Sequence, residues 1–326
     1  MARRKKIKNN STFQVLIGII AFIIIMIMGN NRDLNLLESL KEVTEVDSLE
    51  NVENVDNTIP ETTPSVTGNL VIDYIDVGQG DSILIRQGEA TMLIDGGTSE
   101  CKEDLLNFLQ EENVDKFEYI IGTHPHEDHI GSLDDVINSY DFDTILFPKV
   151  SSTTKTFENL VLAVQNKQKK FTTPVVGTQY FLGEAKFEIL APNNSKYTST
   201  NDYSIVIKLT YGENTFIFTG DAESLSEQEI LNNNVDVSAD VLKLGHHGST
   251  TSTSKKFLEA VNPKYAVISV GKDNSYKHPT KTTMTKLEDM NIPVYRTDEQ
   301  GTIECISDGK NITFNVEPGS YAYMQP

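Results

Sequence analysis

The sequence is poor in cysteine, histidine and basic side chains, and it has no tryptophan. Two cysteines in 326 residues exclude a disulfide-rich scaffold and a thiolate zinc finger, and they allow at most one disulfide, between Cys101 and Cys305. The 28 basic residues face 47 acidic ones, for a net charge of −19. Because such a surface repels phosphate backbones, the composition disfavours general electrostatic binding to nucleic acid. Apolar residues make up 38% of the chain, enough for a buried core.

Charge is distributed unevenly along the chain. Residues 1–31 carry five bases and no acid, whereas residues 32–68 carry two bases and nine acids. The remaining residues are acidic again. These zones predict a basic head, an acidic strip and an acidic globule.

A long apolar stretch follows the basic head. Residues 13–28 contain one polar side chain, Gln14, and would span about 24 Å as a helix, slightly less than the roughly 30 Å of a bilayer core. We predict a basic cytoplasmic head at residues 1–12 and an uncleaved transmembrane signal anchor at residues 13–29. This arrangement places the later residues outside the cell.

Two alternatives stay open for this apolar stretch. A cleaved signal peptide would release the protein as a secreted form, but the exit sequence Ile27-Met28-Gly29-Asn30 lacks the small residues of a cleavage site. A buried core helix is the other alternative, although no amphipathic pattern accompanies the stretch.

Residues 30–68 are predicted to form an acidic flexible stalk. Apolar residues recur there at every third position, whereas a helix stripe needs a period of 3.6, so the row would drift around a helix axis. Pro60 and Pro64 then interrupt any regular structure. We therefore favour a solvated spacer over a partner-binding helix.

From residue 69 onward, short β-branched runs are interspersed with helical patterns. The predicted strands cover residues 70–77, 82–86, 91–94, 119–122, 144–147, 186–190, 204–209, 215–218, 240–243, 265–270, 301–306 and 311–316. The predicted helices cover residues 102–112, 133–139, 155–167, 224–232, 254–261 and 280–290. Early strands follow one another as hairpins do, and later strands alternate with helices. The mixture predicts sheets covered by helices, an α/β or α+β layered domain over residues 69–326.

The six histidines fall in only three places, at residues 123–129, 246–247 and 278. The first cluster has the pattern H-x-H-x-D-H on a loop that leaves a strand. Neutral imidazole and carboxylate are ligands that suit zinc, manganese and iron. His124 and His126 lie two apart in an extended stretch and are placed to share one metal, and Asp128 and His129 are placed to bind a second. The alternative, a hydrogen-bonded polar loop, fits this specific pattern poorly.

Two further predicted strands end in residue types that are able to bind metals. The strand at residues 215–218 leads to Gly220 and Asp221, where glycine permits a tight turn and the carboxylate projects from the strand end. Such a carboxylate is able to bridge two metals. Another strand leads to the neighbours His246 and His247. Because Asp221 would lie beside two histidine-rich strand ends, we predict that it binds metal.

Several short motifs carry a family resemblance. They are DVGQGDS at 76–82, LIDGG at 93–97, THPHEDH at 123–129, FTGD at 218–221, LGHHGS at 244–249, SVG and NSYKHP within 269–279, and RTD and GT within 296–302. The motifs resemble the metallo-β-lactamase superfamily and, within it, are most similar to the extracellular hydrolase domain of the ComEC family of DNA-uptake channel proteins. The resemblance covers roughly residues 69–316.

The resemblance implies an α+β fold, an αββα four-layer sandwich with metals at one edge of the two sheets. It also implies hydrolysis, often of a phosphodiester. Two features depart from the family pattern: Lys277 stands where many relatives have glycine, and the chain shows no multi-span channel region. The second departure argues against a direct role in DNA transport.

The resemblance also implies the ligand sets. No histidine lies between His129 and His246, where β-lactamases, glyoxalase-like and tRNA-processing members place a third histidine for the first metal. A β-lactam hydrolase is therefore not expected. The first metal would bind His124, His126 and Asp221, and the second would bind Asp128, His129, Asp221 and one of the pair His246 and His247. We predict that His246 is the ligand and that the catalytic role of His247 is to face the first metal or the substrate pocket.

Weaker expectations concern the surrounding residues. Asp76 and Asp95 follow apolar strands, and each is predicted to orient a metal-binding histidine; the alternative for each is a turn-forming aspartate. Asn274 and Tyr276 lie on a loop near His278, and we predict that the loop contacts substrate and that His278 protonates the leaving group. The alternative is a structural loop. We also predict that Lys272 contacts phosphate.

Together these observations predict an extracellular, membrane-tethered hydrolase with two divalent metal ions, zinc or manganese. It would cleave phosphodiester bonds in nucleic acid or in the cell envelope through a metal-bridging hydroxide. The alternatives are a catalytically idle binding module with the same fold, or a phosphorylcholine or teichoic-acid esterase. Neither a nucleotide cofactor nor an obligate protein partner is expected. The sequence leaves the oligomeric state open.

Overall fold

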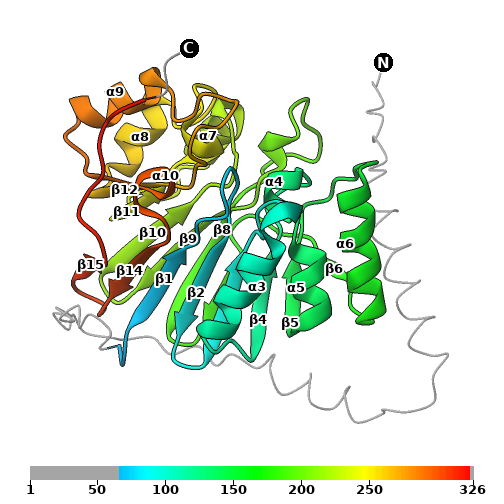
Figure 1. Ribbon diagram of the computed structural model, residues 1–326. Helices are drawn as coiled ribbons and strands as arrows, with labels where there is room; N and C mark the ends of the chain where they lie inside the picture. Colours follow the sequence, from blue (N-terminus) through cyan, green and yellow to red (C-terminus); the bar gives the residue numbers. More distant parts are fainter. Residues whose placement is uncertain (1–65, 324–326) are drawn as a thin grey trace, which may run out of the picture. The chain divides into compact units, whose positions relative to one another are not determined.

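Two β-sheets stack face to face, and helices cover the outer side of each (Figure 1). The computed structural model describes residues 66–323. The predicted head, the predicted anchor at residues 13–29 and nearly all of the predicted stalk lie outside the described residues. Within 66–323, no helix has both the length and the apolar character needed to cross a bilayer.

The first sheet has eight strands in the order β15-β14-β1-β2-β3-β4-β5-β6. The strands are β1 (Leu70–Tyr74), β2 (Ile83–Gln87), β3 (Ala90–Ile94), β4 (Lys116–Ile121), β5 (Asp141–Leu146), β6 (Phe171–Thr172), β14 (Ile303–Ser307) and β15 (Ile312–Phe314). Antiparallel pairing joins β1 to β2 and β2 to β3, whereas β3, β4 and β5 are parallel. The three parallel strands therefore end at one edge of the sheet.

The second sheet has seven strands in the order β13-β12-β11-β10-β9-β8-β7. They are β7 (Gln179–Leu182), β8 (Ala185–Ala191), β9 (Val206–Tyr211), β10 (Asn214–Phe218), β11 (Val241–Lys243), β12 (Tyr265–Ile268) and β13 (Val294–Arg296). Strands β7 to β10 are antiparallel to their neighbours, and β10 to β13 run parallel. This sheet also presents a group of parallel strand ends at one edge.

Helices form the two outer layers. One layer consists of α3 (Lys102–Glu111), α4 (Glu127–Ile130), α5 (Leu133–Ser139) and α6 (Lys155–Asn166); the other consists of α7 (Ser224–Asn232), α8 (Lys255–Val261), α9 (Lys281–Asp289) and α10 (Thr297–Gln300). Short 3-10 turns are η1 (Ser99–Cys101), η2 (Asn201–Tyr203) and η3 (Gly245–Gly248). Three apolar cores result: one between the sheets, and one beneath each helical layer. The layered arrangement agrees with the predicted two-sheet fold.

Local sequence explains where several helices begin and end. Thr154 and Ser254 cap α6 and α8, and each side chain accepts a hydrogen bond from the backbone N–H three residues later, at 3.3 Å. Asn262 ends α8 in the left-handed conformation, with φ of 48°. The sequence predicts no strand at β6, β7 or β13. These strands have two to four residues, and so short a segment shows too little alternation of apolar and polar side chains to be detected.

The two cysteines do not pair. Cys101 lies in the core beneath the helical layer of the first sheet, whereas Cys305 lies in the core between the sheets. Both thiols are free and buried. The two cysteines lie in different layers of the fold and therefore do not form the disulfide that the sequence allows.

Candidate metal centre

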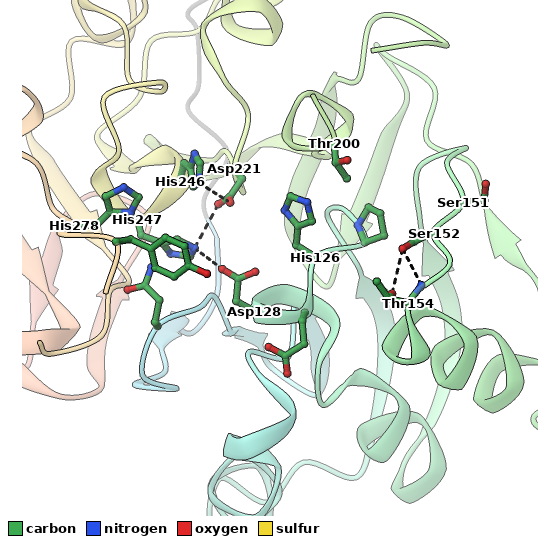
Figure 2. Close-up of a pocket in the computed structure, with 14 residues that line it drawn as sticks. His126, Asp128, Ser151, Ser152, Thr154, Thr200, Asp221, His246, His247 and His278 are labelled. Atoms are coloured by element: carbon green, nitrogen blue, oxygen red, sulfur yellow. Dashed lines mark hydrogen bonds and ion pairs between the residues drawn. The ribbon is translucent and has the colours of Figure 1, made fainter. Parts of the chain in front are cut away.

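All six histidines gather at the edge where the parallel strands of both sheets end. The loop after β4 carries His124 and His126, and the short helix α4 that follows carries His129. The turn η3, after β11, carries His246 and His247. The loop after β12 carries His278. In Figure 2, Asp128 and Asp221 lie between His247 on one side and His126 on the other. The two sheets thus bring three distant sequence motifs to one place.

The first group of possible metal ligands consists of His124, His126 and Asp221, whose ligand atoms lie within 4.8 Å of one another. Nε2 of His124 is 3.0 Å from Nδ1 of His126 and 3.8 Å from Oδ2 of Asp221. The ring of His124 is wholly buried. This group matches the set expected for the first metal.

The second group consists of Asp128, His129, Asp221 and His247. Oδ1 of Asp221 lies 3.2 Å from Nε2 of His129 and 3.6 Å from Nε2 of His247. Nε2 of His247 is also 3.2 Å from Oδ2 of Asp128. Asp221 therefore belongs to both groups and directs one oxygen toward each, which is the arrangement of a bridging carboxylate.

The donor atoms fit divalent metal ions. Nε2 of His129 and Oδ1 of Asp221 are buried, and neither has a hydrogen-bond partner. Buried polar atoms without partners are rare and costly, and atoms that converge on one point are well suited to share a cation. Imidazole and carboxylate donors are those that zinc and manganese accept. These residues would hold two ions.

Hydrogen bonds on the far side of the rings aim the imidazoles inward. Asp95 lies 2.7 Å from Nδ1 of His129, and Asp95 also accepts hydrogen bonds from the backbone and hydroxyl of Thr123. Nδ1 of His247 lies 2.9 Å from the carbonyl of Ser269. Because each Nδ1–H is donated to the protein, each Nε2 keeps its lone pair for a metal. Asp95 thus occupies the orienting position that we expected.

The structure places His247, rather than the expected His246, among the second group of possible ligands. Both histidines adopt left-handed backbone conformations, with φ of 51° and 52°, and Gly248 follows with φ of 83°, so the chain turns at the histidines. The turn buries His247 among the second group of ligands, with 1% of its side chain exposed, and leaves His246 24% exposed. His247, not His246, therefore completes the second group.

The contacts of His246 agree with this placement. The side-chain amide of Asn201 lies 3.3 Å from Nδ1 of His246, and the hydroxyl of Thr251 lies 3.0 Å from the same nitrogen. Nε2 of His246 lies 3.6 Å from Oδ2 of Asp221. Among the described residues, His246 belongs to none of the groups whose ligand atoms converge within 4.8 Å.

The carboxylates around the second group control its charge. Burial alone would lower the pKa of His247, but Asp221 and Asp81 outweigh it and raise that pKa to about 10. The pKa of His129 is raised in the same way. Burial alone would raise the pKa values of Asp128 and Asp221, but the neighbouring imidazoles lower both. Without metal, protons therefore occupy the rings of His129 and His247.

This charge pattern predicts opposite pH dependences with and without metal. A folded pKa of about 10 lies above the roughly 6.5 of an unfolded histidine, so the contribution of His247 to stability is complete below about pH 6.5 and declines as the pH rises toward 10. With a chelator present, we expect the free energy of unfolding to fall between about pH 6.5 and 8.5. With saturating metal, which replaces the proton, it should rise. Urea unfolding at matched pH measures both; parallel pH dependences would contradict the assignment.

A cavity of about 580 Å³ opens onto both groups (Figure 2). Its lining residues are Gln79, Pro125, His126, Glu127, Asp128, Ser151, Ser152, Thr154, Thr200, Asp221, His246, His247, Tyr276 and His278. No lysine or arginine is among these described lining residues. Tyr276 is 65% exposed, and its ring stacks on His278 with 5.9 Å between ring centroids. The expected cavity positions of Tyr276 and His278 are thus observed.

His278 is a neutral group in this setting. Burial, followed by the nearby rings of His246 and His247, lowers its pKa to about 4. Its Nδ1 is buried without a hydrogen-bond partner. A ring with this pKa donates a hydrogen bond at neutral pH but carries no excess proton, which weakens the predicted role as a protonated acid.

Asp76, Lys272 and Asn274 do not line the cavity at the histidines. Asn274 uses its side chain within its own loop: its Nδ2 donates to the carbonyls of Gly271 and His278, and its Oδ1 accepts from the N–H of His278. Lys272 lines a separate cavity of about 680 Å³ and not the cavity at the histidines. Asp76 accepts a hydrogen bond from the N–H of Gly78, the turn-forming alternative.

Sequence reasoning missed Asp81, Lys243 and Asn201. Asp81 lies 3.2 Å from Nδ1 of His247, and Lys243 forms an ion pair with Asp81 at 2.7 Å. The available signal for Lys243 was a lysine within the otherwise apolar run of β11, where a charge needs a buried partner. Asn201 carried no signal, since isolated asparagines are common in loops.

Comparison with known proteins gives a consistent result. The model of the metallo-beta-lactamase superfamily matches residues 75–272. ComE operon protein 3 of Bacillus subtilis (strain 168) is 30% identical over 273 residues, which cover 78% of this chain and 35% of that protein. Recombination protein 2 of Haemophilus influenzae is 32% identical over 237 residues, 71% of this chain and 28% of that protein.

The chain spans about a third of the length of these curated relatives. Among solved structures, a variant of the CmlA beta-hydroxylase is similar with a TM-score of 0.50 and 12% identity, over 71% of this chain and 53% of that one. That likeness concerns the fold alone. The matched residues 75–272 include the segment from His124 to His129, Asp221, and the pair His246 and His247. The chain therefore belongs to the metallo-beta-lactamase superfamily, with the fold of its metal-dependent hydrolases, and is a ComEC-like member of it.

Proposed function

We propose that this protein is a two-metal phosphodiesterase that is held at the membrane by residues 13–29 and acts outside the cell. The observation that carries the proposal is the position of Asp221, which directs one oxygen to each ligand group. Paired metals that share a carboxylate suit in-line displacement at phosphorus, because one ion faces the attacking oxygen and the other the leaving oxygen. The tethering and location rest on the sequence pattern of the first 31 residues.

The chain's own groups have separable tasks in this reaction. When bound, the two metal ions would lower the pKa of a water molecule and neutralise charge that develops on the phosphoryl oxygens. Asp221 holds both ligand groups together. His278 and His246 line the cavity, and we assign His278 to hydrogen-bond the leaving oxygen. Tyr276 at the mouth offers an aromatic face and a hydroxyl to the flanking part of a substrate.

The lining of the cavity bears on the substrate. Hydroxyl groups of Ser151, Ser152, Thr154 and Thr200 supply neutral donors, and the described lining has no lysine or arginine to follow a polyanionic backbone. This composition favours a compact phosphodiester, such as a cell-envelope teichoic-acid or phosphorylcholine ester. Two relatives are named for the ComE operon and for recombination, so nucleic acid is the second candidate substrate.

Turnover of bis(p-nitrophenyl) phosphate tests the proposed activity. The full-length chain, stripped with chelator and reloaded with manganese or zinc, should hydrolyse the ester only after reloading. A panel of single-stranded DNA, RNA, teichoic acid and phosphorylcholine esters then ranks substrate classes by kcat/KM. The Asp240→Asn variant is a matched control, because Asp240 caps the start of β10 through the N–H of Thr215, away from the ligand groups. Absence of turnover in the reloaded protein, with two metals bound, would overturn the proposal.

Replacing His278 should separate donation from metal binding. We expect His278→Ala to keep both metal equivalents and to lower kcat by roughly 10²-fold, at the low end for a positioned proton donor, because the neutral ring donates only a hydrogen bond. Elemental analysis and steady-state kinetics on the same preparation measure both quantities. A loss of metal in this variant would instead make His278 a ligand.

A further inference from the structure

Lys243 is an unusual core residue. It ends β11, its side chain is wholly buried, and it belongs to the largest fully buried side chains of the described chain. Its Nζ donates to Oδ2 of Asp81 at 2.7 Å and to the carbonyl of Leu244 at 3.0 Å. A buried ammonium is costly unless it is paired and hydrogen-bonded, and Asp81 supplies that pair.

Asp81 in turn contacts both loops that carry the second group of ligands. Its backbone N–H donates to the carbonyl of Asp128 at 3.1 Å, and its Oδ1 lies 3.2 Å from Nδ1 of His247. The neighbouring Gly80 makes this approach possible, because a Cβ there would lie 2.4 Å from the carbonyl oxygen of Asp128. The loop before β2 is therefore packed directly against the ligand loops.

The ion pair is hard to explain by stability alone. A buried ion pair contributes little net stability, and apolar side chains of similar size often serve a core as well or better. Asp81 also lies within 4.8 Å of Asp95 and His129, but Oδ2 of Asp81 is held by Lys243 and both oxygens of Asp95 are engaged. The remaining contact of the pair is with His247.

We propose that Lys243 and Asp81 are positioning residues for the second metal, an inference that rests on the proposed two-metal site. Lys243 fixes Asp81, and Asp81 together with the carbonyl of Ser269 fixes the ring of His247. The ring then directs Nε2 at Asp128 and Asp221. Neither positioning residue touches substrate or supplies a ligand.

Replacement of both members of the pair gives the clearest test. Single substitution at Lys243 or Asp81 leaves one buried charge without its partner, which destabilises the fold and obscures any effect on metal binding. The double variant Asp81→Asn with Lys243→Met removes both charges and keeps the shapes close to the original. We expect it to fold, to bind the first metal equivalent as the wild type does, and to bind the second equivalent about 10–100-fold more weakly.

A matched control is the pair formed by Arg86 and Asp73, which is also largely buried and joins β2 to β1 at 2.7 Å. The double variant Asp73→Asn with Arg86→Met should bind both equivalents with unchanged affinity. Titration of the chelated full-length proteins with cobalt(II), followed by its visible absorption bands, measures each equivalent and the geometry of its site. Urea unfolding of both double variants records stability.

The outcomes separate the two proposals. Wild-type affinity for both equivalents and unchanged cobalt bands in the Asp81→Asn, Lys243→Met protein would overturn the positioning role. So would unfolding of this variant, or loss of both equivalents, while the control remains intact, because the pair would then be structural. If the wild type itself binds fewer than two equivalents, the proposed two-metal function fails first.

Discussion

Asp221→Ala should lose both metal equivalents and at least about 10³-fold in phosphodiesterase rate. The reason is that Oδ2 of Asp221 faces the first ligand group and Oδ1 faces the second, so one substitution removes a ligand from each. Two-metal stabilisation of the transition state supplies several kcal/mol, and each 1.36 kcal/mol corresponds to a tenfold change in rate. Elemental analysis and turnover of bis(p-nitrophenyl) phosphate measure the two losses on one sample.

Asp221→Asn gives a version of this experiment with almost no change in shape. The amide keeps one oxygen but loses the charge, so we expect weakened binding of both equivalents rather than of one. The Asp240→Asn variant again controls for the general effect of losing a carboxylate. Retention of two tightly bound metals in Asp221→Asn would refute the bridging role.

His247→Ala should remove one metal equivalent, whereas His246→Ala should keep both. Nε2 of His247 lies 3.2 Å from Asp128 and its ring is buried, so its loss opens the second group. His246 lines the cavity and belongs to neither ligand group, so its loss removes a polar group at the cavity and not a ligand. We expect the rate of His247→Ala to fall by about 10³-fold or more, and that of His246→Ala by roughly 10²-fold.

His246→Ala and His247→Ala serve as controls for each other, because the two histidines are neighbours on the same short turn and have the same side chain. Isothermal titration of the chelated variants with manganese counts the equivalents. If His246→Ala loses an equivalent and His247→Ala does not, the assignment of His247 as the ligand is wrong. If neither loses one, η3 has no part in the metal centre.

The layered fold could be read from the sequence because its long elements have strong patterns. Within residues 66–323, every predicted strand and helix is present, with ends shifted by a few residues, as in β4, which begins at Lys116 rather than Tyr119. Strands such as β13, with three residues, are stabilised by neighbours in the sheet and leave no pattern of their own. Contacts far apart in sequence decide such elements.

The candidate site was predictable to the extent that its ligands cluster in sequence. The H-x-H-x-D-H run and the Gly220-Asp221 strand end indicated their own chemistry, and Gly220 has the positive φ of 49° that this turn needs. The choice between His246 and His247 was not predictable, because it depends on left-handed backbone angles at both. Asp81 was missed since its partner Lys243 lies 162 residues away.

Electron paramagnetic resonance of the full-length protein loaded with two equivalents of manganese(II) tests the central claim most directly. Two ions that share Asp221 would lie about 3.5–4 Å apart, close enough for their electron spins to couple. The account predicts a spin-coupled multiline spectrum, which reverts to a single-ion pattern in Asp221→Ala with any residual metal. Two independent six-line spectra in the wild type, or binding of only one equivalent, would contradict a shared metal centre.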